Sequence, residues 1–254
     1  LGFLYGGNTL GAVIGCLLAG FYLLRVFDMV VATLVAVVIN LAIGGAALWI
    51  SRTTAYEPLH PKKNKKPSEP PRALWPVLVT IGLSGMTALS AEVVWTRVLS
   101  LQLGATVYTY SLILAAVLLG IGIGSSIGSV LTRSGVAPRL LLGLCQSLLI
   151  VGIVWSAYLL TAVFPYKPHD AALSMSLMVT FWHDLSLSLS AILPAALLWG
   201  ASFPLALAAV AGPERDPGRS VGLVYAANTA GAIIGSLGTS LIAMALIGSQ
   251  RIQQ

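Results

Sequence analysis

Long uninterrupted apolar runs dominate the chain, and short polar segments separate them. A helix that crosses about 30 Å of hydrocarbon needs about 20 apolar residues. Seven runs reach this length, at residues 1–24, 29–51, 74–98, 107–131, 140–163, 187–211 and 221–247. They lack the alternation of polar and apolar residues that is typical of barrel strands. Because backbone groups in lipid must form hydrogen bonds within their own segment, the pattern predicts an all-α bundle of about seven transmembrane helices.

The less apolar stretch 164–186 separates the fifth and sixth runs. We expect it to lie outside the membrane, with residues 171–182 forming a short helix on the membrane surface. His183 and Asp184 would then stand at the start of the sixth helix, where the helix dipole favours a carboxylate. Pro194 and Pro204 are expected to kink that helix.

Composition and charge agree with a membrane protein. The chain is 57% hydrophobic and 9% charged, whereas a soluble domain is about 25% charged. A soluble protein of this composition would expose large apolar patches. The net charge of +6 does not indicate nucleic-acid binding, because the basic residues lie mostly in short segments between apolar runs.

The distribution of Lys and Arg predicts the orientation. Residues 52–73 form a basic, proline-rich segment that cannot span, and we expect it to be a flexible cytoplasmic linker. The loops 132–139 and 212–220 would fall on the same side, which places the chain in an inner membrane as a multi-pass protein. Trp75 and Trp95 are expected to be interfacial aromatics at the two ends of the third helix.

An internal repeat is the most informative feature of the sequence. Residues 1–17 align with residues 221–237 at a constant offset of 220, and nine of these 17 positions are identical. By the loop count both copies cross in the same direction, as in transporters built from two similar halves. We therefore divide the chain into the end of a first half (1–51), the linker (52–73) and a second half (74–254).

The repeat supplies most of the candidate functional residues. Glycines four residues apart share a helix face, and such faces allow close helix packing. The asparagines are polar groups at membrane depth, which either form interhelical hydrogen bonds or line a substrate path. The glycines expected to pack are Gly11, Gly15, Gly231 and Gly235, together with Gly120, Gly124 and Gly128 of the fourth helix; the polar candidates are Asn8, Asn228, Tyr5 and Tyr225.

The paired Tyr-x-x-Asn-Thr-x-Gly-Ala-x-x-Gly helices resemble bacterial membrane proteins described as spermidine synthase-like. The segments 92–97 (EVVWTR) and 118–128 (LLGIGIGSSIG) are also similar to that family. The resemblance implies a major-facilitator-like membrane region, which in that family precedes a soluble synthase domain. Residues 128–135 with Arg139 look like a degenerate major-facilitator loop motif, in which Thr132 replaces an Asp.

No synthase domain is recognisable in this sequence. A dinucleotide-type fold needs a strand, a glycine-rich turn and an acidic residue about 20 positions later. The glycines at 120–124 lie inside a continuous apolar run, so we expect helix packing there and no cofactor. Aminopropyl transfer would require a domain beyond this chain. The chain begins inside an apolar segment without Met, which indicates a piece of a longer protein.

Glu92 and Arg97 are the charged candidates within the third helix. An unpaired charge at membrane depth is costly, so each either pairs with a neighbouring helix or reaches headgroups, or Glu92 faces a cavity as a proton- or cation-sensing carboxylate. A polyamine is a polycation and would suit such a carboxylate. Cys16, Cys145 and the scattered histidines form no metal spacing or catalytic arrangement.

Two functional hypotheses follow. The first is the membrane region of a spermidine synthase-like, major-facilitator-like protein that handles polyamines or other small cations. The second is a non-catalytic structural or accessory subunit of a larger membrane complex. Both predict contacts with lipids, and the second predicts other membrane subunits as partners.

Overall fold

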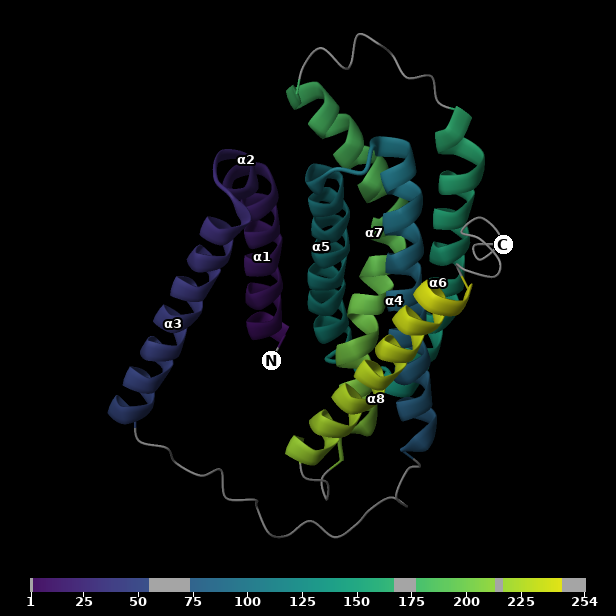
Figure 1. Ribbon diagram of the computed structural model, residues 1–254. Helices are drawn as coiled ribbons and strands as arrows, with labels where there is room; N and C mark the ends of the chain where they lie inside the picture. Colours follow the sequence, from purple (N-terminus) through teal and green to yellow (C-terminus); the bar gives the residue numbers. More distant parts are fainter. Residues whose placement is uncertain (1, 55–73, 167–176, 213–216, 244–254) are drawn as a thin grey trace.

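The computed structural model describes residues 2–54, 74–166, 177–212 and 217–243, and every regular element among them is helical (Figure 1). In this part of the chain, seven helices are long and apolar enough to cross a membrane. The architecture is compatible with a multi-pass integral membrane protein, as the apolar runs predict.

Residues 27–28, 104–106 and 132–137 form short connections between successive helices (Figure 1). Asp28 accepts a hydrogen bond from the backbone nitrogen of Val31 (2.9 Å) and so caps α3. Gly104 has a φ of 96°, a left-handed conformation that suits glycine, where the chain reverses between α4 and α5. The spanning elements are α1 (Gly2–Leu18), a π-helix (Ala19–Leu23) with α2 (Leu24–Val26), α3 (Met29–Thr53), α4 (Trp75–Leu103), α5 (Val107–Leu131), α6 (Pro138–Tyr158) with a π-helix (Leu159–Val163), α7 (Leu177–Val210), and α8 (Pro217–Leu237) with a π-helix (Gly238–Ala243).

The start of α7 corrects one expectation. The helix already begins at Leu177, so residues 177–182 belong to the spanning helix and form no separate surface helix; residues 171–176 lie outside the described residues. Asp184 consequently sits beyond the first turn, where the N-terminal dipole no longer explains it. Its carboxylate lies 3.3 Å from Nδ1 of His183. The helix continues through Pro194 and Pro204.

Trp95 is a second correction. The expectation of an interfacial aromatic is wrong for this residue, because its side chain is 3% exposed and its ring centroid lies 5.5 Å from that of Trp199. The helix α4 extends to Leu103, which places Trp95 two turns inside its end. Trp75, at the first residue of α4, is 69% exposed. A tryptophan in an apolar run therefore marks either the interface or the helical core.

The contact between α5 and α7 is the most extensive in the described structure. Gly124 lies against the backbone carbonyl of Leu197, and a side chain on Gly124 would overlap that carbonyl. In return, Gly200 of α7 lies against the backbone of Ile121. Small residues on both helices thus let the two backbones approach closely, which is how helices associate in lipid. Gly120 and Gly128 extend the same contact toward the two ends of the interface.

The other face of α7 packs against α6. A Cβ atom on Gly152 would lie 3.2 Å from Cα and 3.5 Å from Cβ of Ala195, and the shorter of these distances is tighter than an ordinary van der Waals contact. Hydrogen bonds from α6 supplement this contact: Ser156 Oγ donates to the carbonyl of Ala191, and Trp155 Nε1 donates to the carbonyl of Ser190 (3.0 Å). The helix α7 is therefore the centre of the bundle, between α5 and α6.

The remaining helices pack around this centre, except for α3. The helix α8 packs along α4, and α1 packs along α5. The helix α3 contains no buried residue and projects from the bundle (Figure 1). In Figure 1, α1 and α8 both begin at the lower end and run upward.

Two π-helical segments lie at corresponding positions of the two sequence copies. The segment Ala19–Leu23 follows α1, and Gly238–Ala243 follows α8. Subtracting the offset of 220 from 238–243 gives 18–23, so the two π-helices occupy equivalent positions. The sequence copies thus share an uncommon local backbone geometry.

Replacing Gly124 with leucine tests the contact between α5 and α7. The new side chain would overlap the carbonyl of Leu197, and overpacking of this kind costs about 1–3 kcal/mol. We expect the thermal midpoint of the purified protein in detergent, followed by tryptophan fluorescence, to fall by roughly 2–4 °C per kcal/mol.

Gly143→Leu on α6 is the matched control, because no described atom lies within 4 Å of its Cβ position. Its midpoint should stay within a degree or so of the unchanged protein. Equal losses in the two variants would contradict the α5–α7 contact.

Candidate functional site

Glu92 is the strongest sequence candidate, and the structure places it within the membrane-spanning length of α4. At a rise of 1.5 Å per residue, it lies about 25 Å from the start of α4 and about 17 Å from its end. Its side chain is half-buried. Among the described residues, no hydrogen bond or ion pair involves its carboxylate. The site therefore has a carboxyl group without a hydrogen-bonding or ion-pair partner in that part of the chain.

The remaining acidic side chains of the described structure are accounted for differently. Asp28 caps α3 by accepting a hydrogen bond from the backbone nitrogen of Val31. The Asp184 carboxylate lies within hydrogen-bond distance of His183 Nδ1. Arg97 is exposed and makes its own interactions. Arg97 and Glu92 form no salt bridge in the described structure. This result is expected, because side chains face each other along a helix when they are three or four residues apart, and these two are five apart.

The repeat residues occupy unequal surroundings. Asn228 packs against the backbone of Gly85 on α4 and is half-buried, whereas Asn8 is exposed. Neither amide makes a hydrogen bond with a described residue. The Tyr225 ring contacts that of Phe203 with centroids 4.6 Å apart. Tyr5 lies in α1, and its side chain is outside the described part.

The candidate glycines also divide by environment. Gly231 lies against the backbone of Gly82, and Gly235 lies against that of Met86, so α8 approaches α4 closely. Gly11 and Gly15 have no described atom within 4 Å of their Cβ positions. Gly120, Gly124 and Gly128 pack against α7.

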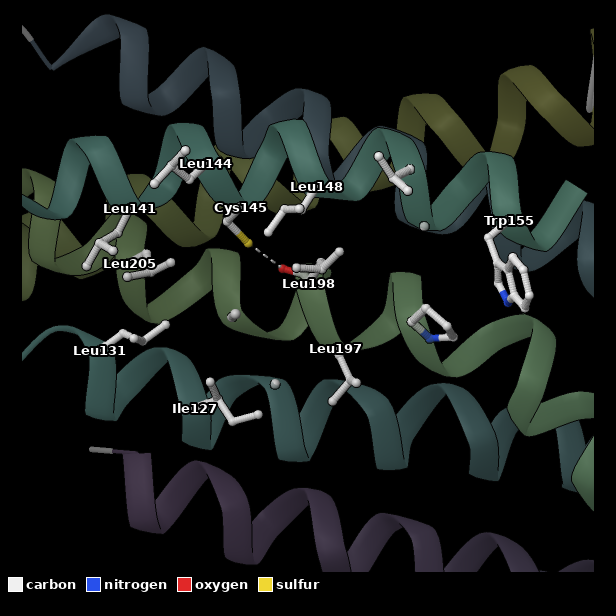
Figure 2. Close-up of a pocket in the computed structure, with 15 residues that line it drawn as sticks. Ile127, Leu131, Leu141, Leu144, Cys145, Leu148, Trp155, Leu197, Leu198 and Leu205 are labelled. Carbon is white, nitrogen blue, oxygen red and sulfur yellow. Dashed lines mark hydrogen bonds between the residues drawn. The ribbon is translucent and has the colours of Figure 1, made fainter.

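An apolar groove between α5, α6 and α7 was not anticipated from the sequence (Figure 2). It has a volume of about 690 Å³, and its lining is almost entirely hydrocarbon. Its outer lining side chains, such as Leu144, Leu148 and Val151, are exposed, so the groove opens to the surroundings of the bundle, which within a membrane are acyl chains. Side chains that line it include Ile127, Leu144, Leu148, Val151, Trp155 and Leu197.

A small polar network borders the groove on the α6–α7 side. Cys145 Sγ donates to the carbonyl of Leu198 at 3.2 Å (Figure 2). Gln146 Nε2 donates to Ser202 Oγ at 2.8 Å, and Ser202 Oγ donates to the carbonyl of Leu198. These bonds join the helices and satisfy polar atoms at membrane depth. Among the described residues that line the groove none is charged, so this lining suits an acyl chain better than a cation.

Sequence reasoning also missed polar groups that the fold buries. Gln102 Nε2 donates to the carbonyl of Leu160 (2.9 Å), while its Oε1 is buried without a partner. Ser188 Oγ is buried in α7 and likewise lacks one among the described residues. Both residues lie in long helices that are apolar on all faces, so a single serine or glutamine gives no periodic signal there.

No cluster of metal-ligating side chains occurs in the described segments. Cys16 and Cys145 are both free thiols, and they lie in different helices. Cys16 Sγ donates to the carbonyl of Ser111 at 3.4 Å, which joins α1 to α5. The cysteines therefore serve helix contacts in this structure.

Comparison with protein-family models, with curated proteins and with solved structures yields no match to this chain.

The exposure of the groove leads to a prediction about tryptophan quenching. Trp155 lines the groove and is half-exposed, whereas Trp95 is buried. In vesicles of lipids brominated on their acyl chains, we expect Trp155→Phe to lower the fraction of emission that the lipid quenches, because an accessible indole is removed.

Trp95→Phe should raise that fraction, since it removes a protected indole. Both variants keep an aromatic ring, so their folds remain comparable. If Trp155→Phe leaves the quenched fraction unchanged, the groove is closed to lipid.

Proposed function

We propose that this chain is the membrane region of a protein similar to the spermidine synthase-like, major-facilitator-like family, and that Glu92 binds a small organic cation such as a polyamine. The observation that carries the proposal is the half-buried Glu92 carboxylate on a spanning helix, without a protein partner in the described structure. A carboxylate at the centre of a spanning helix costs about 3 kcal/mol on insertion scales. A bound ammonium group would offset much of that cost by direct charge pairing.

Two further observations support a cation at Glu92. The other described acidic side chains have local roles as a helix cap and as a partner of histidine. Glu92 also shares α4 with Gly82, Gly85 and Met86, the residues against which α8 packs. A ligand at Glu92 would therefore lie on the helix that joins the core of the bundle to the second repeat helix.

The proposed location is an inner membrane, with the 52–73 linker on the cytoplasmic side. The end of α3, the α5–α6 turn and the start of α8 lie at the lower end of the bundle in Figure 1. Arg52, Arg133, Arg139 and Arg219 belong to these segments. A cluster of arginines at one end of a membrane bundle supports the cytoplasmic assignment of that end.

A second candidate function is a structural or accessory subunit of a larger membrane complex. The helix α3 favours it, because 25 residues of apolar helix bury no side chain within the chain. Apart from partly buried positions near its start, such a helix has its surface available for another membrane subunit. Native mass spectrometry of the complex extracted in mild detergent tests this candidate: a mass that includes a second polypeptide supports it, and a single polypeptide contradicts it.

Glu92→Gln tests the cation site. The amide keeps the shape of the side chain and removes its charge, so we expect the affinity for radiolabelled spermidine, measured on protein in nanodiscs, to fall at least tenfold, or by about 1.4 kcal/mol.

Asp184→Asn is the matched control, since it removes a carboxylate that lies in another spanning helix beside His183. Its spermidine affinity should be unchanged. Equal affinities of Glu92→Gln and the unchanged protein would rule out Glu92 as the binding group.

A further inference from the structure

The two repeat helices use different faces to pack within the chain. The helix α1 buries Thr9 (5% exposed) and Val13 (9% exposed) against α5. The helix α8 buries Val224, Gly231 and Gly235 along α4. Because these two sets occupy different repeat positions, each copy leaves open the face that the other copy uses.

The open face of α1 corresponds to the contact between α8 and α4. Gly11 and Gly15 are exposed with no described atom near their Cβ positions, and Asn8 is exposed beside them. Their counterparts Gly231 and Gly235 pack against the backbones of Gly82 and Met86, and Asn228 packs against that of Gly85. The same residue types, at the same spacing, thus form a helix-binding surface in the second copy.

The open face of α8 gives an independent second observation. Thr229 is exposed, and Ile233 is 53% exposed. Their counterparts Thr9 and Val13 are buried in the first copy, where Thr9 lies against Gly122 of α5. The helix α8 therefore leaves open the surface with which α1 binds α5.

Both open faces point to one occupant. In the second half, α4 and α5 are consecutive helices that contact each other and are joined by a turn at Gly104. A parallel repeat relates α1 to α8 by a rotation about the membrane normal. Under this rotation, a helix equivalent to α4 would lie on the open face of α1. A helix equivalent to α5 would lie on the open face of α8.

We propose that the open faces of α1 and α8 bind the two helices of one transmembrane hairpin, the first-copy counterpart of α4 and α5. Its first helix presents small residues to Gly11 and Gly15, and its second helix packs on Thr229 and Ile233. This proposal goes beyond cation binding and does not depend on it.

A second copy of this chain fits these faces poorly. The surface of α4 that complements the glycine stripe is covered by α8, and the surface of α5 that complements Thr9 is covered by α1. A second copy would have to exchange helices to offer them. Acyl chains are also a poor occupant, because the exposed amide of Asn8 has no hydrogen-bond partner in hydrocarbon.

Photocross-linking of the whole protein in the membranes of its source cell tests the proposal. The photoreactive amino acid p-benzoylphenylalanine is placed singly at Gly15 and at Ile233, and at Val38 of α3 as the control, which is 63% exposed. Mass spectrometry then identifies the peptides attached to each position.

We expect positions 15 and 233 to cross-link to two consecutive transmembrane helices of a single hairpin outside residues 1–254, and position 38 to neither. In addition, Gly11→Leu should lower the cross-linking yield at position 15 severalfold, while the thermal midpoint of the isolated chain stays unchanged, since no described atom lies near Gly11. Attachment to lipid alone, to a second copy of the chain, or to helices of two unrelated polypeptides would overturn the proposal.

Discussion

The close approach of α7 to both α5 and α6 is the constraint on which the rest of the structure depends. Hydrocarbon surroundings give helices no hydrophobic reason to associate, so contact must come from packing and from hydrogen bonds between helices. Glycines supply the packing, because Gly124 and Gly152 remove the side chains that would separate α7 from its neighbours. Serine and tryptophan donors, such as Ser156 and Trp155, then bond directly to carbonyls of α7.

This central packing determines where the candidate sites lie. The groove exists because α5 and α6 both contact α7 while their own outer side chains, such as Ile127 and Leu148, leave space between them. On another side of the bundle, Trp95 of α4 meets Trp199 of α7, whose Nε1 donates to Thr87 Oγ1 (3.3 Å). That contact fixes α4 and, with it, the depth of Glu92. The apolar groove and the carboxylate are therefore separate sites on one scaffold.

Much of the fold could be predicted from the sequence, because a bilayer admits few alternatives. Apolar runs of about 20 residues must be helices in lipid, and the seven spans follow. The start of α7 could not be located in the same way, since residues 177–186 are less apolar than a typical span yet continue a helix that is longer than the bilayer requires. Trp95 was misassigned because tryptophan near a helix end is usual at an interface, and its core contact with Trp199 joins residues more than 100 positions apart.

The candidate sites were less predictable than the fold. Glu92 was identifiable because a charge in an apolar run is conspicuous without any knowledge of its neighbours. The glycine repeats were visible as well, but the sequence gives no reason why Gly231 meets α4 while Gly11 remains open. That difference depends on which helices surround each copy. The groove was invisible, because its lining consists of ordinary leucine and isoleucine side chains from three helices.

Disulfide trapping between α6 and α7 tests the central packing most directly. In a protein whose Cys16 and Cys145 are replaced by alanine, cysteines are introduced as Gly152→Cys and Ala195→Cys, at positions where the Cβ atoms would be 3.5 Å apart. This separation lies within the range of roughly 3.5–4.5 Å that disulfides require. We predict that mild oxidation in the membrane links the pair, and that Gly143→Cys with Ala195→Cys remains unlinked. If the first pair stays reduced while both of its thiols react with a lipid-soluble maleimide, α7 does not pack against α6 as described.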